Sequence, residues 1–380
     1  MTDTPMGDAR VLPDDRPSPT TPVGDAVLSV RDLHVSFPTD DGMVKAVDGV
    51  SYDVFENEVL GIVGESGSGK SVSSMAVLGL LPPSAQITGQ ILYRGTDLLA
   101  LREKDKLKLR GSKLAMVFQD ALAALNPVFT VGGQIAEAIR IHNPDWHRAQ
   151  VRERTIALLD LVGIPNPAAR VDQYPHEYSG GMRQRAMIAM AISNDPDVLI
   201  ADEPTTALDV TIQAQVLEVI ERVQDRTNSA IILITHDLGV VAGVADRVMV
   251  MYAGRPAEIG TVDEIFYETR HPYTLGLMAS LPRLDENSDG ARLHRIKGQP
   301  PSLIFVPTGC PFHPRCEFAR LPEPCSTEIP PLRQIDTVGH RSACHFAEDL
   351  REVGRKDLLM SAEESMAATV AEDPAHGVAE

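Results

Sequence analysis

The stretch Gly64-Glu-Ser-Gly-Ser-Gly69-Lys70-Ser71 decides how the chain is read, because it fits the phosphate-binding pattern Gly-x-x-x-x-Gly-Lys-Ser. It follows an apolar run at residues 59–64, typical of a buried strand, and precedes a helical stretch at 72–81. A chance match in a surface loop is the alternative, and the order strand, loop, helix disfavours it. The predicted nucleotide-binding residues are Gly64, Glu65, Ser66, Gly67, Ser68, Gly69, Lys70 and Ser71.

The chemistry expected of this loop follows from its residue types. Glycines let successive backbone N–H groups curl around phosphates, and the helix N-terminus adds positive potential. Lys70 is expected to reach the β- and γ-phosphates, and the Ser71 hydroxyl to ligate Mg²⁺.

Two further signals follow apolar strands later in the chain. The run VLIADEP places Asp202 and Glu203 at a strand end, where Asp202 can hold Mg²⁺ through water and Glu203 can act as general base. His236 lies at the end of the strand candidate at 230–237 and can sense the γ-phosphate. A histidine after a strand is more often an ordinary surface residue, and here the strand order favours a function.

The hydrophobic pattern predicts an α/β fold. Residues 27–37 and 44–54 alternate as in antiparallel strands, whereas 59–64, 198–202 and 230–237 are continuously apolar, as in a buried parallel sheet. Helical stretches lie between the apolar runs, as expected for a sheet covered by helices. Between about 121 and 193 helical segments dominate, which predicts an inserted helical subdomain.

Composition and charge narrow the class of protein. The chain has 380 residues, 43% of them hydrophobic and 23% charged, with a net charge of −18. This acidic balance disfavours a nucleic-acid partner. No apolar run or N-terminal pattern predicts a membrane span or signal peptide, so we expect a soluble, cytoplasmic protein. Residues 1–25 are expected to form a disordered leader and 347–380 an acidic flexible tail.

Three more motifs, together with His236, give the chain a family resemblance. Tyr178-Ser-Gly-Gly-Met182 resembles the signature motif of ATP-binding cassette (ABC) ATPases, Gln119 the Q-loop, Ala207-Leu-Asp209 the D-loop and His236 the switch histidine. Phe37 stands where that family places an aromatic residue against adenine; the alternative for Phe37 is a core residue of a strand.

The resemblance implies a P-loop ABC ATPase fold. It combines an antiparallel β subdomain, a RecA-like parallel-sheet core, the helical subdomain and a small cysteine-rich C-terminal extension. It also implies Mg-ATP as ligand, with Ser71, Gln119 and Asp202 on Mg²⁺. Cassettes of this family pair head to tail, so Ser179, Gly180 and Gly181 of one chain would contact the nucleotide of a second ATPase chain.

The end of the chain indicates a subfamily. His271-Pro-Tyr-Thr274 and the run IKGQPPSLIFVPTGCPFHPRC resemble the C-terminal extension of oligopeptide and dipeptide importer ATPases, a subfamily that includes nickel and glutathione importers. Residues 26–280 would then form the nucleotide-binding domain and 281–346 the extension. Two alternatives remain: a non-transport ABC ATPase acting on ribosomes or nucleic acid, and a regulatory module that uses ATP only as a structural ligand.

The subfamily resemblance implies a set of partners. The signature motif, which ends in Met182, is similar to that of the D-type subunit, which pairs with a distinct F-type ATPase. Two transmembrane permease subunits and an extracytoplasmic peptide-binding protein would complete the transporter. The chain would then be an ATPase (a translocase) that works as a peripheral subunit on the cytoplasmic face of the cell membrane.

The cysteines all lie in the extension, at Cys310, Cys316, Cys325 and Cys344. Four thiolates at such spacing can converge on one metal site. The subfamily resemblance favours a four-iron, four-sulfur (4Fe-4S) cluster, with structural zinc as the alternative. Four reduced cysteines without metal are the third possibility.

Overall fold

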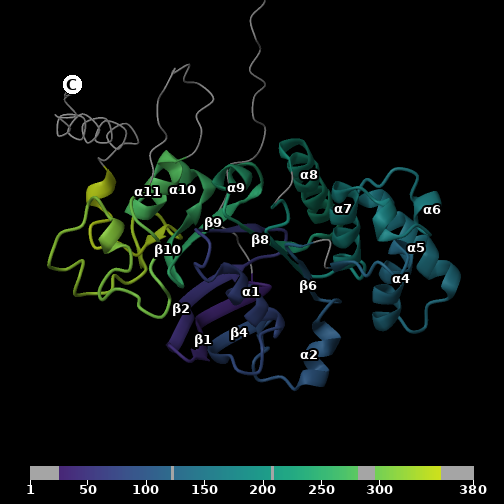
Figure 1. Ribbon diagram of the computed structural model, residues 1–380, viewed down its shortest axis with the longest axis horizontal. Coiled ribbons are helices and arrows are strands. Elements are labelled where there is room, and N and C mark those ends of the chain that lie inside the picture. The colour runs from purple at the N-terminus through teal and green to yellow at the C-terminus, as the bar shows by residue number, and fades with distance from the viewer. Residues whose placement is uncertain (1–24, 121–123, 207–208, 281–295, 352–380) are drawn as a thin grey trace, which may run out of the picture.

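The computed structural model describes residues 25–120, 124–206, 209–280 and 296–351 (Figure 1). Its smaller sheet is antiparallel, in the order β2-β1-β4-β5. The strands are β1 (Leu28–Thr39), β2 (Gly42–Val54), β4 (Gln86–Tyr93) and β5 (Thr96–Asp97). Residues such as Leu28 and Val30 are fully buried and share one apolar cluster with Leu60 and Ile62 of the larger sheet. The alternating pattern at 27–37 and 44–54 thus corresponds to β1 and β2.

The larger sheet has the order β11-β12-β10-β9-β3-β8-β7-β6 and is mixed. Its parallel strands are β3 (Val59–Val63), β6 (Leu114–Val117), β7 (Val198–Asp202), β8 (Ala230–Thr235) and β9 (Arg247–Tyr252). Its antiparallel strands are β10 (Arg255–Thr261), β11 (Arg333–Gln334) and β12 (Arg341–Ser342). Every residue of β3, β7 and β8 is buried, which explains their continuously apolar sequences.

The register of this sheet brings the three predicted site segments to one edge. Val63 of β3 pairs with Thr235 of β8, and Asp202 of β7 pairs with Ile234 of β8, all in parallel. The segments that follow these strands therefore begin side by side. Ligands of open α/β sheets bind at the carboxyl ends of the strands, so the topology places the phosphate-binding loop, Glu203 and His236 in a ligand-binding position.

A group of helices lies between β6 and β7 in the chain and forms the right-hand side of the molecule in Figure 1. Its members are α4 (Val131–His142), α5 (Arg148–Leu161), α6 (Pro167–Arg170), the short turn η1 (Pro175–Glu177) and α7 (Gly180–Ala191). Ile135, Ile139 and Leu158 are completely buried where these helices pack. These helices lie within the range 121–193, for which the sequence predicts a helical subdomain; residues 121–123 lie outside the described part.

The remaining helices accompany the two sheets. They are α1 (Lys70–Leu78), α2 (Glu103–Leu109), α8 (Val210–Thr227), α9 (Leu238–Val244), α10 (Val262–Tyr267) and α11 (Pro272–Ala279). Within the described residues, no helix has both the length and the apolar character required to cross a membrane.

Residues 296–351, which comprise the described part of the predicted extension (296–346) and the first residues of the predicted tail, attach to the larger sheet. Its regular elements are the turns η2 (His313–Arg315) and η3 (Asp349–Arg351) with β11 and β12. Ser342 of β12 pairs with Glu258 of β10, and Phe312 packs edge-on against Tyr252 at 5.2 Å between ring centroids. Residues 1–24 of the predicted leader, and most of the predicted tail, lie outside the described residues.

Candidate active site

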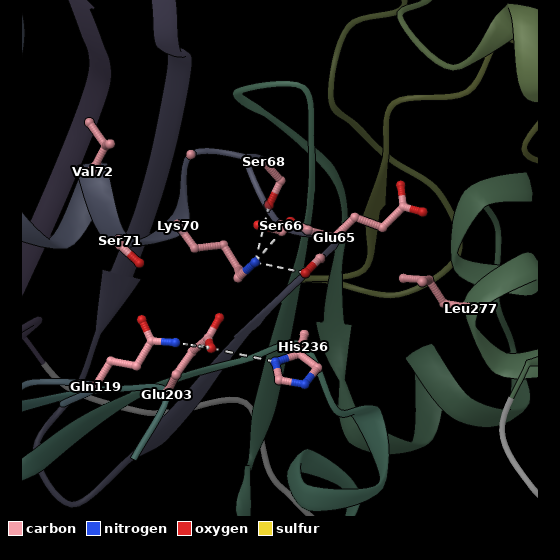
Figure 2. A pocket seen from close by; sticks show the side chains of 13 residues that line it. Glu65, Ser66, Ser68, Lys70, Ser71, Val72, Gln119, Glu203, His236 and Leu277 are labelled. Carbon is pink, nitrogen blue, oxygen red and sulfur yellow. Dashed lines mark hydrogen bonds and ion pairs between the residues drawn. The ribbon is translucent and has the colours of Figure 1, made fainter. Parts of the chain in front are cut away.

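A cavity of about 640 Å³ lies at the carboxyl ends of β3, β7 and β8 (Figure 2). Its walls are formed by Gly64, Glu65, Ser66, Gly67, Ser68, Gly69, Lys70, Ser71, Val72, Gln119, Glu203, His236 and Leu277. The structure thus brings together the whole predicted phosphate-binding loop, the Q-loop glutamine, the proposed base and the proposed switch histidine. The sequence did not point to Leu277 of α11, which joins the wall from the C-terminal part of the chain.

The backbone of the loop requires glycine at its final turn. Gly69 has a φ of 98°, and a Cβ placed there would lie 2.3 Å from the carbonyl oxygen of Ala46. The left-handed conformation and the close approach both exclude a side chain. Helix α1 begins at the next residue, Lys70, so its positive N-terminal end lies at the cavity wall, where it favours a bound anion.

Lys70 supplies a buried cation to the cavity. Its side-chain Nζ donates to the carbonyl oxygens of Gly64, at 2.7 Å, and Glu65, at 3.0 Å. Burial lowers the pKa of Lys70, and the nearby charges of Glu203, Asp202 and Glu65 oppose that shift. An ammonium group held at a loop of backbone N–H groups is suited to phosphate.

Ser71 and Asp202 form an oxygen pair beside the cavity. The Ser71 hydroxyl donates to Asp202 Oδ1 at 2.9 Å, linking the start of α1 to the end of β7. Burial raises the pKa of Asp202, and the hydrogen bond from Ser71 counteracts this shift. Hydroxyl and carboxylate oxygens are ligands that Mg²⁺ prefers, so this donor set fits the ion.

Glu203 is the centre of the polar contacts on the opposite wall, as Figure 2 shows. Its Oε2 accepts hydrogen bonds from Gln119 Nε2 at 3.0 Å and from the Thr206 hydroxyl at 2.8 Å, and lies 3.6 Å from His236 Nδ1. Its backbone φ is 47°, an uncommon conformation for a residue with a side chain. Such outliers cluster at functional sites, so the conformation supports a role for Glu203.

Thr206 is a contact that the sequence analysis missed. In the sequence, only its spacing of three residues after Glu203 could have indicated it. In the structure, its backbone N–H donates to the Glu203 carbonyl in a turn. The turn returns the Thr206 hydroxyl to the carboxylate, so Thr206 helps to fix the orientation of Glu203.

The predicted signature residues lie outside this cavity. Ser179 caps α7, where its hydroxyl accepts from the Met182 N–H at 3.3 Å. Ser179 and Gly180 are exposed, whereas Gly181 is buried and a Cβ there would lie 3.0 Å from Ile212. The two exposed residues at the start of α7 are thus available to a second molecule.

Phe37 and Asp209 also lie away from the cavity walls. Phe37 is half-buried and packs against the apolar cluster of the smaller sheet. Asp209 is exposed and caps α8 by accepting from the Ile212 N–H at 3.0 Å. The adenine role of Phe37 and the D-loop role of Asp209 stay predictions. Residues 207–208 of the D-loop lie outside the described part.

The cysteines require a correction. The Cys310 N–H donates to the Cys325 carbonyl at 2.9 Å, so two of the four lie close in the fold. In the ranges that the structure describes, however, no group of three or more His, Cys, Asp or Glu side chains is arranged to hold a metal ion. Burial raises the pKa of Cys316 and Cys344 to about 12, which favours the thiol over the metal-binding thiolate. The predicted iron–sulfur cluster is therefore contradicted, and zinc gains no support.

Comparison with known proteins agrees with this geometry. Residues 47–206 match the model of the ABC transporter family, and residues 257–325 match that of the oligopeptide/dipeptide transporter C-terminal region. The structure of CbiO1 from Clostridium perfringens, part of an ABC transporter complex, superposes with a TM-score of 0.56 at 30% identity, covering 64% of this chain and 91% of that one.

Curated relatives are more similar in sequence. The dipeptide transport ATP-binding protein DppD of Bacillus subtilis is 57% identical over 76% of this chain and 86% of its own length. The oligopeptide transport ATP-binding protein OppD of Escherichia coli is 47% identical over 84% and 93%, respectively. The OppD of Mycobacterium bovis is 52% identical over 84% of this chain, which spans only 51% of that relative. The chain therefore belongs to the family of ATP-binding proteins of oligopeptide and dipeptide ABC transporters.

Proposed function

We propose that this chain hydrolyses ATP to power the import of di- or oligopeptides through an ABC transporter. The observation that carries the proposal is one cavity that joins the phosphate-binding loop, with the buried Lys70, to Glu203 and its polar partners. The match of residues 257–325 to the transporter C-terminal region, and the names of the relatives, support peptides over nickel or glutathione as cargo.

In this proposal the loop binds the triphosphate and the pair beside it binds Mg²⁺. Lys70 and the N-terminus of α1 stabilise the phosphate charge. Ser71 and Asp202, with Gln119 from across the cavity, are the residues that would hold Mg²⁺. When bound, this ion neutralises charge on the β- and γ-phosphates.

Glu203 is the proposed general base. Its Oε2 accepts two hydrogen bonds and faces the cavity, where it can take a proton from the attacking water. Gln119 and Thr206 hold the carboxylate in place. His236, 3.6 Å from the same oxygen, is half-exposed on the same wall and can contact the γ-phosphate.

The proposal includes a second ATPase chain and membrane partners. Ser179 and Gly180 are exposed at the start of α7 and can contact nucleotide bound by another cassette. The proposed partner cassette is a distinct F-type ATPase chain. Two permease subunits and an extracytoplasmic peptide-binding protein complete the assembly. The chain then acts as a peripheral subunit on the cytoplasmic face of the membrane.

Replacing the proposed base separates ATP binding from hydrolysis. In the assembled transporter, Glu203→Gln removes the proton acceptor and keeps the shape of the side chain. We expect MgATP binding to be retained, and both phosphate release and ATP-dependent uptake of a labelled peptide to fall at least about a hundredfold, within the range typical of general-base loss.

Glu218→Gln is the matched control, because Glu218 is exposed on α8 and does not line the cavity. It should leave hydrolysis and uptake unchanged. Sustained steady-state hydrolysis by the Glu203→Gln transporter would remove Glu203 from the role of base. Normal hydrolysis in wild-type protein without peptide uptake would contradict the proposed cargo.

A further inference from the structure

An ion pair joins the C-terminal region to the phosphate-binding loop. Arg315 Nη1 lies 2.6 Å from Glu65 Oε2, and Arg315 Nη2 lies 2.9 Å from Glu65 Oε1. This is the bidentate arrangement in which a guanidinium binds a carboxylate most strongly. The two residues are separated by 250 positions in the sequence, so the contact exists only in the folded chain.

The Arg315 side chain is held rigidly on the C-terminal side. It is only 5% exposed, its Nε donates to the Lys297 carbonyl at 3.0 Å, and its Nη1 donates to the Tyr252 hydroxyl at 3.3 Å. The hydrogen bonds to Glu65 raise the pKa of Arg315 further above its usual value, so the group is permanently charged. The two further acceptors fix the planar guanidinium group, so that its fork is already oriented to receive the Glu65 carboxylate.

The backbone of Glu65 is held from the same side. Its N–H donates to the Tyr273 hydroxyl at 2.9 Å, and Tyr273 belongs to α11. The Tyr273 ring packs against Phe312 at 5.4 Å, and Phe312 stands three residues before Arg315. The backbone and the carboxylate of one loop residue are therefore both attached to the C-terminal part of the chain.

Glu65 has a position where a free carboxylate would oppose anion binding. It lines the same cavity as Lys70, and its charge is one of those that act on the Lys70 ammonium. In Figure 2 the Glu65 carboxylate points away from Lys70, toward the side from which Arg315 pairs with it. Without a partner, this carboxylate can turn toward the phosphate-binding loop and repel a triphosphate.

We propose that Arg315 is a positioning residue for ATP binding, which holds the Glu65 carboxylate away from Lys70 and neutralises it. The C-terminal region thereby determines the electrostatic field of a loop that lies far away in the sequence. This inference rests on the proposed function only in requiring that the chain binds MgATP.

The test is a cycle of substitutions in the full-length chain, titrated with Mg²⁺ and a slowly hydrolysed ATP analogue. Arg315→Met leaves Glu65 unpaired, and we expect the dissociation constant to rise about tenfold, because the freed carboxylate repels the triphosphate at close range. Adding Glu65→Gln to Arg315→Met removes the repelling charge, and the dissociation constant should return to within about threefold of the wild-type value.

Two further variants separate this role from a general loss of structure. Arg315→Lys keeps the charge but loses the bidentate geometry, so its affinity should lie between those of wild type and Arg315→Met. Arg333→Met is the matched control, because Arg333 forms a bidentate pair with Glu348 in the same region and does not line the cavity. It should bind the analogue as wild type does.

Steady-state hydrolysis in the assembled transporter gives an independent readout. Arg315→Met should raise KM for MgATP while leaving kcat at saturating ATP within about twofold, because Glu203 and its partners are not altered. Unchanged affinity in Arg315→Met, or weak binding that Glu65→Gln does not restore, would overturn the inference. Failure of the wild-type chain to bind the analogue would instead overturn the proposed function itself.

Discussion

At the scale of single residues, the site depends on charges that are buried beside one another. Lys70 lies close enough to Glu203, Asp202 and Glu65 for all three to affect its pKa, and Glu65 is also paired with the cation of Arg315. The ammonium of Lys70 keeps one region of the cavity positive among these carboxylates. Removing it would leave acidic groups facing an acidic ligand.

Lys70→Ala should therefore weaken nucleotide binding strongly. We expect the dissociation constant for MgATP to rise on the order of a hundredfold, since a buried cation is lost while the carboxylates remain. Equilibrium titration of the purified chain measures this change. Lys113→Ala is the control, because Lys113 is half-exposed and pairs with Asp197 at 3.1 Å. Equal affinity in wild type and Lys70→Ala would refute the assigned role of Lys70.

At the scale of elements, the docking of the helical subdomain depends on one close approach. Gly132, in the first turn of α4, donates its N–H to the Val171 carbonyl at 2.9 Å. A Cβ at Gly132 would lie 2.2 Å from Val171 Cγ2 and 2.4 Å from the Val171 carbonyl oxygen. Backbone and side chain together leave no room for even a methyl group, so α4 is fixed against this segment.

Gly132→Ala should lower the free energy of unfolding by about 1–3 kcal/mol, the usual cost of overpacking. Chemical denaturation followed by circular dichroism measures the change. Gly243→Ala in α9 is the control: in the described part of the chain, no atom other than those of its chain neighbours and its own helix backbone lies within 4 Å of a Cβ at that position, and alanine favours a helix by up to about 1 kcal/mol. If both variants were equally stable, the proposed contact would not limit the packing of α4.

At this scale, the sequence could predict those features that depend on neighbouring residues, but not those that depend on contacts between distant segments. The strands and the phosphate-binding loop are local patterns, so β3, β7 and β8 and the residues after them were predictable. The contact between Glu65 and Arg315 was not, because it depends on how distant segments meet. Cysteine spacing likewise shows that thiols are neighbours in sequence, but not how their side chains are directed, and here the predicted cluster was wrong.

At the scale of the whole molecule, stability should depend on pH through a histidine that folding keeps neutral. His271 is completely buried at the start of α11, and burial lowers its pKa to about 4. Its Nδ1 accepts from the Tyr273 N–H at 3.1 Å, a role that requires the unprotonated nitrogen. The unfolded chain binds a proton near pH 6.5 and the folded chain does not, so stability is present above pH 6.5 and is lost as pH falls toward 4.

Between pH 7 and pH 5 this group should reduce the free energy of unfolding by about 2 kcal/mol. His271→Asn keeps an acceptor for the Tyr273 N–H but cannot take up the proton. Denaturation at both pH values should therefore show a smaller loss of stability in His271→Asn than in wild type. An identical loss in the two proteins would assign the pH dependence to other groups.

The attachment of the C-terminal region to the larger sheet also protects that sheet from other chains. Strand β10 would otherwise be its last strand and would present a row of unpaired backbone groups, which are templates for aggregation. Strand β12 pairs with β10 at Glu258 and Ile259, and β11 covers β12 in turn with only two residues, Arg333 and Gln334. The strand that finally faces outward is short and carries an arginine, two features that discourage edge-to-edge association of molecules.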